Sequence, residues 1–287
     1  MLPRLEWAER LGLVLTVQNG WGSPGDTINT ATLVRHVKGR YPRLRVNVIT
    51  RHAELLAHDP AIDSLNEPPG LLWHVFWYPE LLRRKGRTGS VLDESAQTLG
   101  LGPVAYAARV YLTPAERAWG AAQVAALPRP IVAFNTKSKE SVKDWPEERW
   151  REALQVLGER GSLVHLGDDK EPEFAGVTRL AGRLSLRESM AVLAHADAHV
   201  GPDSFLMHAA NGLGVRSVIV FGGSRPVAVL GYAGNENLGV AIECGPCWLH
   251  PSKGEQCPYG VRCMAMIGPT DVVAAVERLL AASTAGT

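Results

Sequence analysis

The chain has 287 residues, of which 46% are hydrophobic and 21% charged, as in ordinary globular proteins. This length suits two domains or one large one, with enough apolar residues for a core that needs neither disulfides nor metals. The 30 basic and 29 acidic residues give a net charge of +1, which argues against a general nucleic-acid-binding protein. No apolar run approaches the ~18–20 residues of a membrane helix, and the charged start is unlike a signal peptide. A cytoplasmic protein is therefore expected.

The first part of the chain alternates short apolar runs with helical patterns. Strands are expected at 13–17, 44–49 and 71–78, and helices through 28–39 and 114–127. Thr113 is the expected N-cap of the second of these helices. The sequence Pro128-Arg129-Pro130 marks a domain boundary, because the alternation starts afresh beyond it.

The second part of the chain repeats the alternation. Strands are expected at 131–135, 162–166, 198–200 and 217–221, and helices at 146–160, 185–195, 204–213 and 270–282. Ser185 followed by Glu188 is a capping-box pattern. Strands that alternate with helices predict an α/β protein with parallel sheets. We expect two Rossmann-like domains, 1–127 and 128–287, that face each other across a ligand-binding cleft.

Two polar loops follow predicted strands and are candidates for ligand binding. The loop at 20–26 contains three glycines and ends in Asp26, which alone is also expected as a helix N-cap. The loop at 135–146 combines lysines with hydroxyl-bearing residues, among them Thr136, Ser138 and Lys143. Such groups ahead of a helix suit phosphate binding, although a solvated polar loop has the same composition.

A third loop, at 201–208, begins a helix at Asp203 and Ser204, and the amides of that helix can hold an anion. His208 belongs to the same helix, where it is either a site residue or a core histidine bonded to the backbone. Gly222 and Gly223 follow the next strand and are expected to line the same pocket.

Four cysteines lie within 20 residues, in the pattern C-x2-C-x9-C-x5-C formed by Cys244, Cys247, Cys257 and Cys263. Four thiolates suit a closed tetrahedral site for zinc or iron, with a structural role because no coordination position stays open. Disulfides are the alternative, which the reducing cytoplasm disfavours. The segment is also a candidate contact in a homo-oligomer.

The motifs and their order along the chain resemble those of glycosyltransferase family 9, the ADP-heptose:acceptor heptosyltransferases. The matching segments are PGDTINTATLVRHVKGRYP, KDWPEERW, LGDDKE, LSLRESMAVLAHADAHVGPDSFLMHAANGLG, FGGSRP and the cysteine cluster. They cover most of 131–282 and about 25–50. The resemblance implies a GT-B fold and an inverting transfer of a sugar, heptose from ADP-heptose, to an acceptor hydroxyl. It implies no need for a divalent metal in the reaction.

The resemblance also implies a role for each matching residue. Asp26 would be the general base, Lys143 would bind the donor diphosphate, and Asp169 would contact the ribose. The other implied donor-binding residues are Thr136, Ser138, Asp203, Ser204, His208, Gly222 and Gly223. Phe205 stands where the family usually has Gly, a departure that bears on the identity of the sugar.

Other functions remain open from the sequence alone. The chain is also compatible with another GT-B sugar-nucleotide enzyme, such as an epimerase, or with a non-catalytic scaffold built around the cysteine finger. An acceptor glycan, a protein hydroxyl and a small natural product are equally compatible. The cations Arg83, Arg84, Lys85 and Arg87 either grip an anionic acceptor or form a solvated face.

Overall fold

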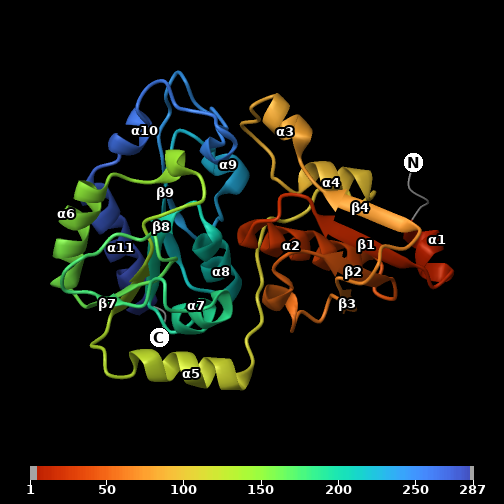
Figure 1. The fold of residues 1–287 in the computed structure, drawn as a ribbon, viewed down its shortest axis with the longest axis horizontal. Coiled ribbons are helices and arrows are strands. Elements are labelled where there is room, and N and C mark those ends of the chain that lie inside the picture. Colours follow the sequence, from red (N-terminus) through yellow and green to blue (C-terminus); the bar gives the residue numbers. More distant parts are fainter. Residues whose placement is uncertain (1–4, 285–287) are drawn as a thin grey trace. The chain divides into compact units, whose positions relative to one another are not determined.

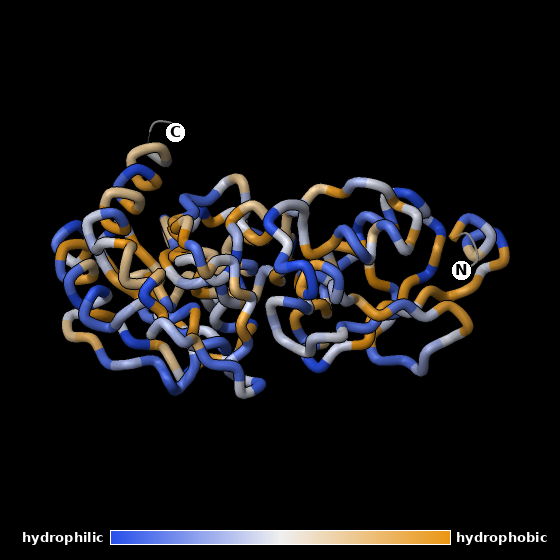
Figure 2. The backbone as a smooth tube through the Cα atoms, turned by 90° about the horizontal axis from the view of Figure 1, so that it is seen from above, coloured by the Kyte–Doolittle hydropathy of each residue, from blue (hydrophilic) through white to orange (hydrophobic). Residues whose placement is uncertain are grey.

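The computed structural model describes residues 5–284, which divide into two compact units on either side of the bond between Tyr111 and Leu112. Each unit contains a parallel β-sheet with helices packed against it (Figure 1). Hydrophobic stretches run through both units, whereas hydrophilic stretches predominate at their peripheries (Figure 2). Among residues 5–284, no helix is both long and apolar enough to cross a membrane.

Unit 1, which ends at Tyr111, is built on a sheet with the strand order β3-β2-β1-β4. Its elements are α1 (Leu5–Arg10), β1 (Val14–Asn19), α2 (Pro24–Arg40), β2 (Arg45–Ile49), the 3-10 turn η1 (Ala53–Leu56), β3 (Ser64–Leu65), β4 (Leu72–Phe76), α3 (Pro79–Arg83) and α4 (Asp93–Thr98). Helix α2 lies on the sheet face that bears Asn19, whose amide donates to Thr27 of α2 at 3.0 Å.

The crossover from β3 to β4 is a short loop, residues 66–71, that spans the sheet face opposite α2. The loop is held by polar contacts: Asn47 Nδ2 donates to the Glu67 carbonyl at 2.9 Å, and the Gly70 amide donates to Thr16 Oγ1 at 3.4 Å. A parallel sheet is ordinarily covered by helices on both faces. Here Trp73 and Val75 of β4, which lie on the loop-covered face, remain 51% and 41% exposed.

Unit 2 begins at Leu112 and contains a larger parallel sheet, ordered β10-β9-β8-β5-β6-β7 among the described residues. Its strands are β5 (Ile131–Phe134), β6 (Ser162–His165), β7 (Thr178–Arg179), β8 (Ala198–Pro202), β9 (Ser217–Gly222) and β10 (Glu236–Gly239). Its helices are α5 (Pro114–Val124), η2 (Ser141–Lys143), α6 (Glu147–Gly158), α7 (Leu186–Leu193), α8 (Phe205–Leu213), α9 (Val227–Leu230), η3 (Pro251–Lys253), α10 (Arg262–Ala265) and α11 (Pro269–Thr284). The strand order reverses between β5 and β8.

Helix α5 packs in unit 2, whereas the boundary predicted at Pro128 assigned it to the first domain. Gly120 of α5 lies against α7, since a Cβ there would come within 2.1 Å of the Ala191 carbonyl oxygen. Glu116 also pairs with Arg187 of α7, at 2.5 Å. Both predicted helix starts are confirmed: Thr113 caps α5, and Ser185 with Glu188 forms a capping box on α7.

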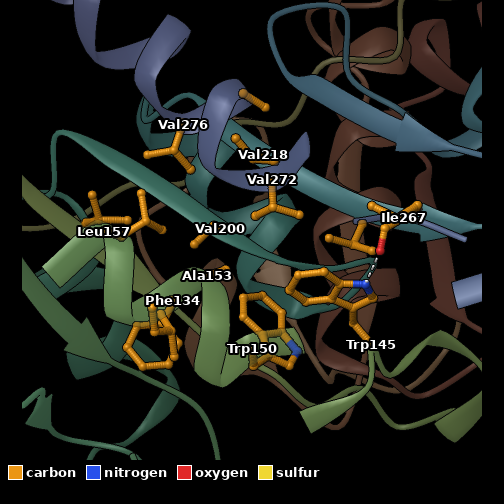
Figure 3. Close-up of a cluster of buried hydrophobic side chains, with 14 of the residues drawn as sticks. Phe134, Trp145, Trp150, Ala153, Leu157, Val200, Val218, Ile267, Val272 and Val276 are labelled. Carbon is orange, nitrogen blue, oxygen red and sulfur yellow. Dashed lines mark hydrogen bonds between the residues drawn. The ribbon is translucent and has the colours of Figure 1, made fainter. Parts of the chain in front are cut away.

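Helices α6 and α11 cover one face of the larger sheet and form its main hydrophobic core (Figure 3). Trp150 and Leu157 of α6 meet Val272 and Val276 of α11 over strand residues such as Val200. Trp145, just before α6, donates its indole N–H to the Ile267 carbonyl at 3.1 Å, so a large ring is buried with its polar atom satisfied. This core extends to the last residue of β5, Phe134, and the polar loop begins directly beyond it.

The core can be probed at α6. Leu157→Ala should lower the free energy of unfolding by about 2–5 kcal/mol, because Leu157 is buried and its removal leaves a cavity. The neighbouring Val156→Ala, at a position 37% exposed, should change it by less than about 0.5 kcal/mol. Urea unfolding followed by tryptophan fluorescence measures both, and equal effects at the two positions would contradict this packing.

Candidate functional site

An ion pair joins the loops that follow β5 and β8, where the reversal in strand order creates the crevice in which such sheets bind ligands. Lys143 Nζ lies 3.2 Å from Oδ2 of Asp203, and both side chains are largely buried. Burial alone raises the pKa of Asp203, but the nearby cations Lys143 and Arg225 outweigh it, so the pKa lies below its ordinary value. Asp203 is therefore ionised at neutral pH.

Further polar contacts fasten the same two loops together. Ser138 Oγ donates to the Asp203 carbonyl at 3.2 Å, and Asn135 Nδ2 donates to Ser204 Oγ at 3.2 Å. The side chain of Ser204 makes no capping bond to α8, so it leaves the first amides of that helix to other acceptors. The structure thus brings together the predicted site residues Ser138, Lys143, Asp203 and Ser204.

His208 lies buried in α8, with Nδ1 2.8 Å from the Tyr232 hydroxyl. Burial lowers its pKa to about 4, so the imidazole is neutral at pH 7. Its hydrogen-bond partner is a side chain, whereas the alternative considered from the sequence was a backbone group. His208 therefore offers a neutral ring, which can donate or accept a hydrogen bond, rather than a cation.

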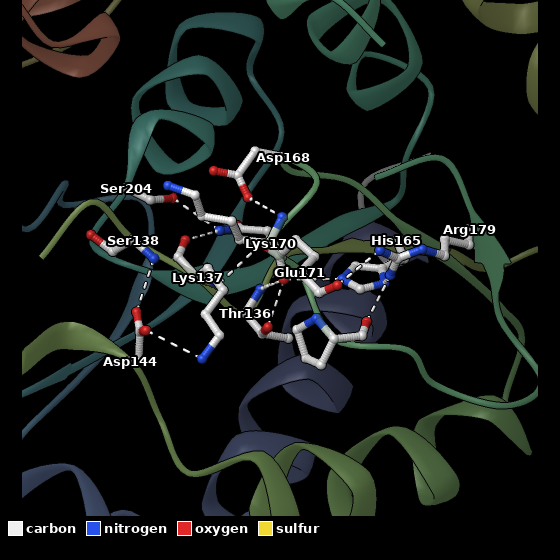
Figure 4. A network of polar contacts seen from close by, with 12 residues as sticks. Thr136, Lys137, Ser138, Asp144, His165, Asp168, Lys170, Glu171, Arg179 and Ser204 are labelled. Carbon is white, nitrogen blue, oxygen red and sulfur yellow. Dashed lines mark hydrogen bonds and ion pairs between the residues drawn. The ribbon is translucent and has the colours of Figure 1, made fainter. Parts of the chain in front are cut away.

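Thr136 supports the loop through a buried carboxylate (Figure 4). Its amide and its hydroxyl both donate to Glu171 Oε2, at 2.9 and 2.6 Å, and the Lys137 amide donates to Oε1 at 3.0 Å. His165 Nε2 lies 3.1 Å from the same carboxylate. The Thr136 hydroxyl is thus engaged inside the protein, and its predicted contact with a phosphate stays a prediction.

The three remaining donor-site candidates lie in two different environments. Asp169 is exposed in the loop after β6, at the sheet edge that also carries the ends of β5 and β8. Gly222 and Gly223 are buried: a Cβ on Gly222 would lie 2.2 Å from Met264 Sδ, and one on Gly223 2.7 Å from Ile242. The close approach that these glycines permit is to the segment that carries the cysteines.

Arg225, which the sequence analysis did not single out, ends the loop after β9 and is 5% exposed. Its guanidinium donates to Ser224 Oγ at 3.0 Å and to the Leu249 carbonyl at 2.8 Å, and it lies 4.9 Å from the centre of the Trp248 ring. The available signal was a cation in the FGGSRP segment directly after a predicted strand.

In unit 1, Asp26 lies in the first turn of α2, where the helix dipole favours a negative charge. Ser23, not Asp26, is the N-cap: Ser23 Oγ accepts from the Asp26 amide at 3.1 Å and donates to Oδ2 at 2.5 Å. Tyr78 donates to Oδ1 at 3.3 Å. The Asp26 carboxylate is thus oriented by two hydroxyl groups.

An aromatic cluster that the sequence analysis missed lies beside Asp26. Trp21 and Trp77 stack with ring centres 4.1 Å apart, and Tyr78 tilts against Trp21 at 4.8 Å. Gly20 permits this arrangement, since a Cβ there would come within 2.5 Å of the Trp77 ring. Partly exposed indole rings beside a carboxylate form a surface suited to a ligand with an apolar face.

The basic segment of α3 is partly neutralised at the surface. Arg83 and Arg84 reach Glu80 at 2.6 and 3.2 Å, and all three side chains are at least half exposed. Exposed pairs of this kind contribute little to stability. Two of the four candidate acceptor-binding cations therefore already have a carboxylate partner, and their contact with an acceptor stays a prediction.

The four cysteines lie on the segment between β10 and α11, with free thiols. Burial raises the pKa of the Cys263 thiol, and Cys247 and Cys257 raise it further. The donor set is right for a tetrahedral thiolate site. Even so, within residues 5–284 no three His, Cys, Asp or Glu side chains come close enough to hold a metal ion.

Comparison with known proteins shows to which family the chain belongs. The profile of glycosyltransferase family 9 (heptosyltransferase) matches residues 96–257, more than half of the sequence. The chain belongs to glycosyltransferase family 9. It is 31% identical over 175 residues to lipopolysaccharide heptosyltransferase 1 of Pseudomonas aeruginosa, a match that covers 53% of this chain and 49% of that protein. The matched region thus spans about half the length of this curated relative.

Solved structures share the fold at low sequence identity. A family-9 glycosyltransferase from Veillonella parvula is 15% identical with a TM-score of 0.73, over 93% of this chain and 97% of that one. The iron-containing dodecameric glycosyltransferase TibC of enterotoxigenic Escherichia coli is 17% identical with a TM-score of 0.71, over 93% and 75% of the two chains. The predicted GT-B fold class is confirmed.

The Lys143–Asp203 ion pair can be tested by removing its cation. Lys143→Met should raise the pKa of Asp203, because burial then acts on the carboxylate with less opposition. In the unsubstituted protein, the lowered pKa of Asp203 stabilises the fold at pH values above the unfolded pKa of about 3.9, and this stabilisation is lost as the pH falls. The Lys143 variant should therefore lose stability mainly at neutral pH. Carboxyl NMR titration and urea unfolding at pH 4 and 7 measure both effects.

The control is Lys139→Met, which removes an exposed lysine from the same loop and should leave the titration of Asp203 unchanged. An unaltered Asp203 titration in the Lys143 variant would show that the pair does not set its charge.

Proposed function

We propose that this chain is an inverting glycosyltransferase that moves heptose from ADP-heptose to an acceptor hydroxyl. The observation that carries the proposal is the buried Lys143–Asp203 pair at the switch between β5 and β8, next to the first turn of α8. A lysine and helix amides at one crevice suit a diphosphate. Family membership and the ADP-heptose complex of TibC support the choice of donor.

The reaction is a single displacement. The acceptor oxygen attacks the anomeric carbon, the bond from that carbon to the diphosphate oxygen breaks, and ADP leaves from the opposite face. Asp26 takes the proton from the attacking hydroxyl, since its carboxylate lies in the first turn of α2 and is oriented by Ser23 and Tyr78.

Charge that develops on the departing diphosphate is stabilised by groups already in place. Lys143 supplies an ammonium group and α8 supplies amides, so no divalent metal is needed for the transfer. His208, neutral through burial, can hydrogen-bond a sugar or phosphate oxygen without adding charge. Asp169, exposed at the same sheet edge, is the residue we assign to the ribose.

The acceptor is assigned to the aromatic cluster of Trp21, Trp77 and Tyr78 beside Asp26. Ring faces suit the apolar face of a sugar, which favours a glycan over a protein hydroxyl or another small natural product. Phe205, partly exposed at the start of α8, is assigned to the pocket of the transferred sugar. We place the reaction in the cytoplasm, where the sequence predicts the protein.

The test combines donor binding with transfer. ADP-heptose should raise the melting temperature more than UDP- or GDP-sugars do, and Asp26→Ala should keep that shift while transfer falls at least about 100-fold, because the general base is gone. Glycan acceptors are screened with the unsubstituted protein. Asp93→Ala, at an exposed carboxylate of the same unit, is the control and should keep full transfer. Near-normal transfer by the Asp26 variant would refute the assigned base.

We further propose that Cys244, Cys247, Cys257 and Cys263 bind one zinc or iron ion with a structural role. The support is the set of four free thiols in one short segment and the iron-containing TibC of the same fold. When bound, the ion would cross-link a segment that has little core of its own, with no open position for substrate. The same segment is the candidate contact for a homo-oligomer.

Elemental analysis of protein purified under reducing conditions should give about one zinc or iron per chain. Cys257→Ser should lose the metal because a hydroxyl is a poor substitute for a thiolate ligand, whereas Tyr259→Phe, at an exposed neighbour, should retain it. Gel filtration of the same samples measures the oligomeric state. Purified protein without metal, or with two disulfides by mass spectrometry, would overturn the assignment.

A further inference from the structure

Arg225 stands at the carboxyl end of β9, next to the crevice already described. Strands β8 and β9 pair in parallel, with Pro202 opposite Val220, so Arg225 and Asp203 follow neighbouring strands at the same sheet edge. The positive charge of Arg225, together with that of Lys143, helps to hold the pKa of Asp203 below its ordinary value. Two buried cations therefore approach the edge at which a ligand enters.

The guanidinium is held in a fixed orientation. It lies over the Trp248 ring and donates to the Leu249 carbonyl, and both residues belong to the cysteine loop, residues 244–263. A planar guanidinium held in this way loses little rotamer freedom when it binds a ligand. The hydrogen bond to Ser224 Oγ, at 3.0 Å, fixes the same plane from the strand side.

The cysteine loop is fastened to the crevice a second time. Ser252 donates its amide and its hydroxyl to Glu140, at 2.9 and 2.5 Å, and His250 Nδ1 lies 3.5 Å from the same carboxylate. Glu140 belongs to the loop after β5 that also carries Lys143. The loop thus contacts the strand ends of both β5 and β9, and it can set the position of Arg225 relative to Lys143.

We propose that Arg225 binds the diphosphate of the nucleotide-sugar donor, and that Trp248 is its positioning residue. This rests on the proposed function, which puts a diphosphate in the crevice. Lys143 is already paired with Asp203, so one ammonium group is a weak match for a diphosphate that carries several charges. A guanidinium adds a planar fork that can bond two phosphate oxygens at once.

The test is calorimetric titration of the whole chain with ADP and with adenosine. Arg225→Gln should weaken ADP binding about 10- to 100-fold, as expected for lost hydrogen bonds to a charged group, and leave adenosine binding unchanged. The ADP affinity of Arg225→Lys should lie between those of the unsubstituted chain and Arg225→Gln, because lysine keeps the charge but lacks the planar fork of the guanidinium. Arg216→Gln is the matched control: this arginine precedes β9 at its opposite end and also donates to a backbone carbonyl.

The positioning role of Trp248 is tested by comparing its single variants with a double variant that also carries Arg225→Gln. Trp248→Leu should weaken ADP binding less than Arg225→Gln does, and the double variant should bind ADP no more weakly than Arg225→Gln alone, because both changes remove one contact. Trp248→Phe keeps a ring under the guanidinium and should bind ADP nearly as well as the unsubstituted chain, which guards against a folding defect in the leucine variant. Additive losses would overturn the positioning role.

The remaining outcomes separate the two proposals. An unsubstituted chain that does not bind ADP would refute the proposed donor site, and with it the role of Arg225. A chain that binds ADP, but whose Arg225→Gln variant binds it equally well, would overturn only the inference drawn from Arg225. Equal losses of ADP and adenosine affinity would show a structural arginine and would overturn it as well.

Discussion

The buried ion pair of Lys143 with Asp203 is the interaction on which the candidate donor site depends. It ties the loop after β5 to the end of β8, and the contacts of Ser138 and Asn135 lie around it. Burying two charges costs several kcal/mol of desolvation each, which their attraction repays only with good geometry. A fold gains little stability from such a pair. Its position at the carboxyl ends of the strands therefore favours a role in a preorganised binding site over a purely structural role.

A second buried carboxylate, that of Glu171, holds the loop after β5 in place. Glu171 accepts three hydrogen bonds from Thr136 and Lys137, so the backbone after β5 is fixed before any ligand arrives. Preorganised groups need no rearrangement when charge develops during a reaction. Polar residues at the ends of these strands therefore divide into those that face the crevice and those that hold the loops in place.

The sequence predicted much of this because parallel α/β folds follow local rules. The strand at 131–135 is observed at Ile131–Phe134 and the helix at 146–160 at Glu147–Gly158, and the capping residues stand where expected. Strands β3 and β7, each two residues long, leave no readable period. The two compact units meet at Leu112 rather than at Pro128, and α5 contacts α7 through residues remote in sequence, such as Glu116 and Arg187.

In the candidate site, too, local sequence patterns were predictable, whereas contacts between distant segments were not. The motifs indicated which loops carry Ser138, Lys143, Asp203 and Ser204, since the carboxyl ends of parallel strands meet at one edge. They could not show that Thr136 bonds Glu171, because a hydroxyl that supports a loop and one that binds a phosphate have the same local sequence. Arg225 and the stacked pair of Trp21 and Trp77 depend on contacts between distant segments, which spacing does not encode.

The short crossover at 66–71 has a consequence for how unit 1 responds to temperature. Hydrogen bonds from Asn47 and to Thr16 hold one face of its sheet, and Trp73 and Val75 on that face are already half in water. Unfolding exposes little new apolar surface there, and newly exposed apolar surface is what gives unfolding its large positive heat capacity. The heat-capacity change of unit 1 therefore arises mainly from apolar surface buried elsewhere in the unit, and this face contributes little to the temperature dependence of its stability.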